Sequence, residues 1–182
     1  MRQVVLAGIK GDRRPADRRP RAQRITFEAV REERPGPKLR GLYQRGRHAY
    51  LEWYLRDGEA ARPSLEQAQS ALQRHMPELM RPWSALVSAV GADERGARML
   101  TLYDPPPLLS GCSQAALRGD PALVRNYDYD PRLFDAVVLE TALTGTRVIG
   151  TADQLWGLLD GVNDRGLAVS FTFGGRRCSG RG

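Results

Sequence analysis

Apolar residues recur at helical spacing through the first half of the chain. The first such run is interrupted at Asp57-Gly58. Ser64 and Gln67 form the pattern Ser-x-x-Gln, which predicts a capping box at the start of a second helix. Pro105-Pro106-Pro107 ends the helical half, because proline fixes the backbone and disfavours helix in the residue before it. The expected helices span about residues 39–56, 65–76, 82–91 and 93–103.

The pattern then changes to short, strand-like apolar runs. Gly119-Asp120 and Thr144-Gly145-Thr146 separate neighbouring runs, and such short turns join antiparallel strands. Residues 25–30 alternate apolar and polar positions and predict one further strand before the helices. Helices followed by strands indicate an α+β fold, with the helices covering one face of an antiparallel sheet. The later strands are expected at residues 112–117, 122–129, 136–143, 147–152, 155–159 and 166–173.

The positive charge of the chain is concentrated near its N-terminal end. The whole chain carries a net charge of +7, and residues 1–24 contain seven Arg, one Lys and two Asp. This segment lacks apolar periodicity, so residues 1–24 are predicted to be a basic disordered tail. Residues 25–182 are predicted to form a single α+β domain that is nearly neutral. A nucleic-acid-binding arm is the alternative for the tail, but no nucleic-acid or membrane partner is expected for the domain.

Cysteine and histidine usage indicates neither a metal site nor a disulfide framework. The two cysteines are Cys112 and Cys178, and His48 and His75 stand alone among helical patterns. No metal and no cofactor are therefore expected. No apolar stretch approaches the roughly 20 residues of a membrane-spanning helix, and the N-terminus lacks the apolar core of a secretory signal. These features predict a cytoplasmic, reducing location.

Five short blocks of sequence stand out in order along residues 25–175. They are Pro35-Gly36-Pro37-Lys38, Arg74-His75-Met76-Pro77-Glu78-Leu79, Pro105-Pro106-Pro107 with Gly111-Cys112-Ser113-Gln114, Leu123-Val124-Arg125-Asn126-Tyr127-Asp128-Tyr129, and Trp156-Gly157-Leu158-Leu159-Asp160-Gly161-Val162-Asn163 with Gly166-Leu167-Ala168-Val169-Ser170. In these blocks the chain resembles the acyl-coenzyme A:6-aminopenicillanic acid acyltransferase family of N-terminal nucleophile hydrolases, which is related to the choloylglycine hydrolases. The resemblance implies part of an αββα sandwich, with a helical pro-segment at 25–111 and a strand-rich nucleophile segment at 112–182.

The resemblance also implies a reaction centred on Cys112. A thiol that follows glycine can attack the unhindered Gly111 carbonyl, and cleavage between Gly111 and Cys112 leaves one residue with a nucleophilic sulfur and a free α-amine. The mature thiol would act on amide or thioester acyl groups by ping-pong acyl transfer. The family pattern makes Asp128 the group that holds the new amine and places Arg125 near the thiolate.

Other readings of these residues remain open from the sequence. Arg125 and Asp128 lie three residues apart, so on a regular strand they point to opposite faces unless a bulge or the strand end intervenes. An exposed ion pair is the structural alternative for both. Asn126 is a candidate for orienting neighbours or binding substrate, with a turn or sheet role as the alternative. Asn163 is predicted to be structural, and backbone amides around residues 170–173 are the candidate oxyanion donors.

The resemblance predicts a C-terminally truncated chain. Family members continue for a long stretch after the segment that matches Gly174-Gly175, whereas this sequence ends at Gly182. A sheet that lacks its facing sheet is expected to leave an apolar face open. The alternative to an enzyme is therefore an inactive fragment that acts as a partner-bound scaffold or a homodimer.

Overall fold

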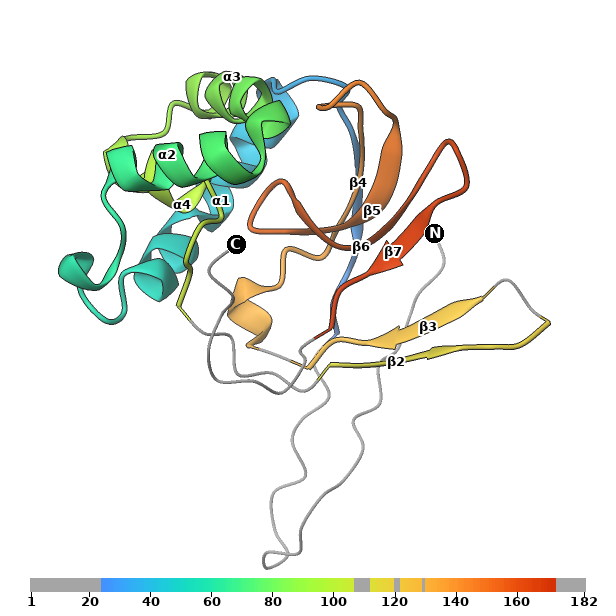
Figure 1. Ribbon diagram of the computed structural model, residues 1–182. Coiled ribbons are helices and arrows are strands. Elements are labelled where there is room, and N and C mark those ends of the chain that lie inside the picture. The colour runs from blue at the N-terminus through green and yellow to red at the C-terminus, as the bar shows by residue number, and fades with distance from the viewer. Residues whose placement is uncertain (1–23, 107–111, 120–121, 129, 173–182) are drawn as a thin grey trace, which may run out of the picture.

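The computed structural model describes residues 24–106, 112–119, 122–128 and 130–172. Within these residues, four helices precede most of the strands, so the predicted α+β class is confirmed (Figure 1). Short 3-10 turns lie at Glu59–Ala61, Pro77–Leu79 and Pro131–Leu133. The helices are α1 (Pro37–Tyr54), α2 (Leu65–His75), α3 (Met80–Val90) and α4 (Glu94–Met99).

The N-terminus of α1 is capped from outside the helix. Its N-cap residue, Gly36, has no side chain to accept a hydrogen bond. The Glu32 carboxylate instead accepts from the backbone amides of Gly36, Lys38 and Leu39 at 3.1, 3.0 and 2.9 Å. These three amides belong to the first turn, where no intrahelical partner exists. Glu32 therefore connects the end of the first strand to the longest helix.

Local signals predicted the starts of the helices well. The capping box is present, since Ser64 Oγ accepts from the Gln67 amide at 3.2 Å and Gln67 Oε1 accepts from the Ser64 amide at 2.8 Å. The fourth helix is shorter than predicted. It stops at Met99 because Leu102 adopts a left-handed conformation with φ of 55°. Thr101 Oγ1 also donates to the Arg98 carbonyl at 2.6 Å at this end.

In the described part of the chain, seven strands form two sheets. Five strands make a sheet of order β1-β4-β5-β6-β7, and β2 and β3 pair as a separate two-stranded sheet. The strands are β1 (Glu28–Arg31), β2 (Ser113–Ala116), β3 (Leu123–Asn126), β4 (Val137–Thr141), β5 (Val148–Asp153), β6 (Gly157–Asn163) and β7 (Ala168–Ser170).

Two features of the larger sheet differ from the sequence prediction. The sheet is mixed, because β1 runs parallel to β4 while the other pairs are antiparallel. Its partner β4 follows the whole helical half, and such a long connection permits parallel pairing that turn analysis does not detect. The run predicted as a strand at 155–159 begins as a turn, with Gln154 and Leu155 at positive φ, and continues as β6 to Asn163.

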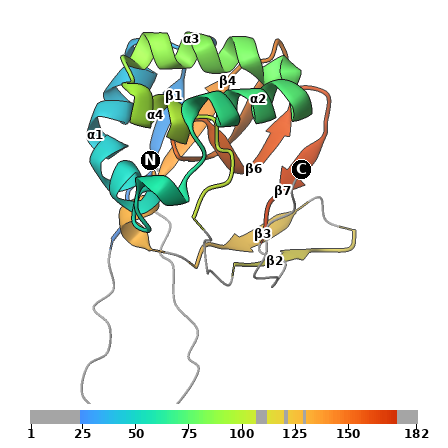
Figure 2. The same ribbon diagram turned by 60° about the vertical axis from the view of Figure 1, so that its left-hand side comes forward.

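The two faces of the five-stranded sheet have different surroundings. Leu139 lies on the face that the helices cover and is 0% exposed, in a core that includes Tyr43, Trp53 and Leu86. Leu139 of β4 pairs with Gly150 of β5, so the residue before Gly150, Ile149, points to the opposite face. There it is 44% exposed. Figure 2 shows the hairpin β2–β3 away from α2 and α3 and near the end of β7. No helix in the described residues is long and apolar enough to cross a membrane.

Candidate active site

Cys112 directly precedes β2 and is partly buried. Its backbone carbonyl accepts a hydrogen bond from Thr172 Oγ1 at 2.9 Å. Thr172 lies just after β7, so this bond connects the start of the hairpin to the edge of the larger sheet. Gly111, the other residue of the predicted cleavage site, lies outside the described residues.

The register of the hairpin indicates which residues share a face with Cys112. Gln114 lies opposite Arg125, and Ser113 lies opposite Asn126. Extending this register by one residue places Cys112 opposite Tyr127. Side chains alternate along a strand, so Cys112, Gln114, Arg125 and Tyr127 belong to one face. Arg125 is then a diagonal neighbour of Cys112, a spacing that a long side chain can bridge.

Arg125 points from the hairpin into the larger sheet, and its side chain is only 5% exposed. Its Nη1 donates to Ser170 Oγ at 2.6 Å, and its Nε lies 3.9 Å from Asp160 Oδ2. The guanidinium carbon also stacks 4.9 Å from the centre of the Tyr127 ring. Nε and Nη2 are buried without a hydrogen-bond partner. The structure thus holds a positive charge out of water beside the strand that begins after Cys112.

Tyr127 completes this cluster. Its hydroxyl donates to Asp160 Oδ2, while its ring packs at 5.2 Å against Phe134. Burial and the hydrogen bond to the Asp160 carboxylate together raise the pKa of Tyr127 to about 12, partly opposed by Thr151 and Arg125. Tyr127 is therefore a neutral hydrogen-bond donor near neutral pH, not a base.

The other two predicted site residues are exposed. Asn126 is the last residue of β3, and Asp128 follows beyond the strand. The strict alternation that would force Arg125 and Asp128 onto opposite faces therefore does not apply to Asp128. The structure nevertheless separates their environments. Among the described residues, Asp128 has neither a hydrogen bond nor an ion pair, whereas Arg125 is buried against Asp160 and Ser170.

Sequence reasoning missed the residues that receive the hairpin. Asp160 and Ser170 are paired neighbours on β6 and β7, and Asp160 Oδ1 accepts from the Thr151 amide at 3.4 Å. Gly150 lets β5 and β6 approach closely here, because an added Cβ would clash with the Asp160 carbonyl. A carboxylate inside an apolar strand run was the available signal for Asp160, since such a group needs a buried partner.

Two further predictions concern backbone groups near this site. Asn163 is structural as predicted, because its Oδ1 accepts from the amides of Arg165 and Leu167 at 3.0 and 2.9 Å within the turn. The Phe171 amide, one of the candidate oxyanion donors, already donates to the Leu159 carbonyl at 2.7 Å. That amide is therefore not free to stabilise an oxyanion.

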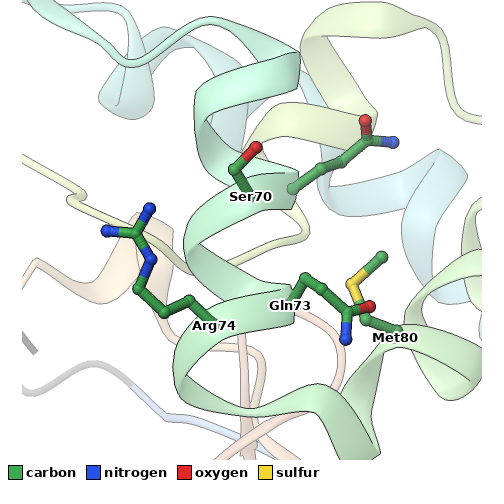
Figure 3. Close-up of a pocket in the computed structure, with 5 residues that line it drawn as sticks. Ser70, Gln73, Arg74 and Met80 are labelled. Carbon is green, nitrogen blue, oxygen red and sulfur yellow. The ribbon is translucent and has the colours of Figure 1, made fainter.

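A separate surface hollow lies on the helical layer. It has a volume of about 490 Å³ and is lined by polar side chains of α2 with Met80 of α3 (Figure 3). Its polar groups come from Gln69, Ser70, Gln73 and Arg74, and none of them belongs to the hairpin or the larger sheet. Within the described part of the chain, no three His, Cys, Asp or Glu residues are grouped so that they would hold a metal ion.

Comparison with known proteins supports the resemblance seen in the sequence. Residues 117–182 match the family model described as acyl-coenzyme A:6-aminopenicillanic acid acyl-transferase. The matched segment contains Arg125, Asp128, Asp160 and Ser170 and begins downstream of Cys112. No curated protein and no solved structure matches the chain. This segment is thus similar to an acyltransferase family.

Proposed function

We propose that the protein is a self-cleaving N-terminal nucleophile amidohydrolase or acyltransferase whose nucleophile is Cys112. The observation that carries this proposal is the position of Arg125. Its buried guanidinium lies in the family-matched segment and on the hairpin face that the register assigns to Cys112. A fixed positive charge beside a thiol favours the reactive thiolate.

Maturation would proceed in two steps. The Cys112 sulfur attacks the Gly111 carbonyl carbon, and the peptide bond breaks as the acyl group moves from nitrogen to sulfur. The released nitrogen takes up the thiol proton and becomes the α-amine of Cys112. Water then hydrolyses the thioester, which leaves a carboxylate on Gly111 and restores the thiol. The products are two chains, 1–111 and 112–182.

Turnover would use the two groups that cleavage creates. The α-amine, whose ordinary pKa is about 7.7 to 8.0, accepts the thiol proton as the sulfur attacks an amide or thioester carbonyl. The same proton then passes to the leaving amine or thiol, and the acyl group stays on sulfur. Water or an acceptor amine releases it in the second half of the ping-pong reaction. No histidine is required for this proton transfer.

The surrounding groups have distinct proposed roles. Thr172 holds the Cys112 carbonyl, which fixes the backbone of the nucleophile. Arg125 supplies positive charge near the sulfur, and Asp128 receives the new amine from its exposed position after β3. Asn126, which pairs with Ser113 at the end of β3, is proposed as a substrate contact.

Mass spectrometry of the intact purified protein tests this proposal. The wild-type protein is expected to yield the masses of 1–111 and 112–182, and Cys112→Ala is expected to yield only the uncleaved chain. Cys112→Ser is the matched control, because a hydroxyl can undergo the same shift at a lower rate. An uncleaved wild-type chain would contradict the proposal and favour the alternative of a non-catalytic scaffold.

A further inference from the structure

Within the described residues, the hairpin β2–β3 has few points of attachment to the rest of the protein. All four residues of β2 are exposed, and within β3 only Arg125 is withdrawn from solvent. Leu117, Leu123 and Val124 leave 52%, 45% and 59% of their surface in solvent. An isolated two-stranded hairpin is marginally stable in water. Its position therefore depends on the groups that hold Arg125 and the two ends of the hairpin.

Asp160 is in contact with both Arg125 and Tyr127 of the hairpin segment. Its Oδ2 accepts from the Tyr127 hydroxyl and lies 3.9 Å from Arg125 Nε. Its Oδ1 accepts from the Thr151 amide at 3.4 Å on the neighbouring strand β5. One carboxylate therefore joins two hairpin-side residues to the centre of the larger sheet.

The negative charge of Asp160 is also needed to balance the buried Arg125 guanidinium. The Arg125 guanidinium is buried, two of its nitrogens have no hydrogen-bond partner, and Asp160 is its ion-pair partner among the described residues. Ser170 supplies a neutral hydrogen bond, which does not balance the charge. Removing one member of a buried pair leaves an uncompensated charge, and the cheapest relief is exposure of that charge to water. For Arg125, exposure to water means release of the hairpin.

We propose that Asp160 is a positioning residue that latches the Cys112 hairpin onto the five-stranded sheet through Arg125 and Tyr127. Its effect on self-cleavage rests on the function proposed above, whereas the latch itself does not. With the latch closed, the Thr172 bond to the Cys112 carbonyl and the buried guanidinium hold the start of β2 in one place. With the latch open, Cys112 keeps its chemistry but loses its fixed position.

Hydrogen exchange of the full chain tests the latch directly. Asp160→Asn is expected to speed exchange of the amides in β2 and β3 by about tenfold or more, the factor that corresponds to about 1.4 kcal/mol. Protection of β4 and β5 is expected to remain, which shows that the variant is folded. Asp160→Glu keeps the charge and is expected to restore much of the protection. Asp164→Asn, which removes an exposed carboxylate in the β6–β7 turn, is the matched control and is expected to leave exchange unchanged.

The rate of self-cleavage supplies the second readout. Asp160→Asn is expected to slow the break between Gly111 and Cys112 while the sheet stays protected, and Asp160→Glu is expected to recover part of the rate. Equal hairpin exchange in wild type and Asp160→Asn would overturn the latch, as would a wild-type hairpin that exchanges at once. If the wild-type chain never cleaves, the proposed function fails, but the exchange comparison still decides the role of Asp160.

Discussion

A tyrosine–aspartate pair lies on each side of the five-stranded sheet, and the two pairs differ in what balances the carboxylate. On the helical side, Tyr50 of α1 donates to Asp135 Oδ1, and the Leu155 amide donates to Oδ2 at 3.1 Å. On the hairpin side, Tyr127 donates to Asp160, which also has Arg125 as an ion-pair partner. The first pair joins helix to sheet, and the second joins the hairpin to sheet.

The two carboxylates differ in the groups that surround them. Burial, opposed by the hydrogen bond from the Leu155 amide and aided by the Asp153 carboxylate, raises the pKa of Asp135 to about 7. Asp160 lies beside a guanidinium instead. The helical side is thus built around apolar packing and a carboxylate held by neutral hydrogen-bond donors, while the hairpin side is built around a charge pair. Apolar packing holds the helices on the sheet, whereas a charge pair holds the hairpin at a defined position on it.

The largest expected effect comes from the covered face. Leu139→Ala removes a fully buried side chain in β4 and is expected to lower the free energy of unfolding by about 2–5 kcal/mol. Urea denaturation followed by circular dichroism measures this change. The loss arises because the helices above β4 cannot fully collapse into the space that the side chain leaves.

The matched control for this change lies on the other face. Ile149→Ala removes a similar side chain from β5, where it is 44% exposed, and is expected to cost less than about 1 kcal/mol. Equal losses for the two variants would show that the open face is covered in solution. The contrast between the faces would then be wrong.

A smaller effect is expected from the pH dependence of Asp135. Its pKa is about 7 in the folded protein, against an ordinary value of 3.8, so the folded state retains a proton that the unfolded state loses between these values. The resulting stability is complete below pH 4 and is lost as the pH rises through 7. The free energy of unfolding is expected to fall by up to about 1.4 kcal/mol per pH unit within this window.

Denaturation at pH 5 and pH 8 checks this prediction. Asp135→Asn is expected to flatten the fall, because an amide does not titrate, while the exposed-site variant Asp164→Asn is expected to keep it. A fall of equal size in Asp135→Asn would assign the pH dependence to other groups. Tyr50 would then pair with a carboxylate that is ionised throughout.

Local sequence patterns predicted most of the fold, but they did not predict the pairing of strands that are far apart in the sequence. The capping box at Ser64 needs only four consecutive residues, and it was found at the predicted position. The end of α4 depends on left-handed backbone at Leu102, which apolar spacing does not report. The parallel pairing of β1 with β4 joins segments separated by the whole helical half, so no turn signal announces it.

The candidate site divides in the same way. The segment around Arg125 and Asp128 was identified through its resemblance to the acyltransferase family, and it lies in the part of the chain that matches the family model. Arg125 is buried by Asp160 and Ser170. These two residues come from β6 and β7, which follow much later in the sequence. Their role depends on sheet register, because Asp160 and Ser170 pair side by side on the face that meets the hairpin.

The most direct test of the central claim is whether Cys112 carries an acyl group during turnover. The purified protein would be treated with the hexanoyl thioester of N-acetylcysteamine, quenched in acid, digested and analysed by mass spectrometry. We predict a hexanoyl group on the sulfur of an N-terminal Cys112 peptide, in wild type and in Cys178→Ser, but not in Cys112→Ala. Acyl label that is absent from Cys112, or that is equally abundant in Cys112→Ala, would contradict the role of Cys112 as the nucleophile.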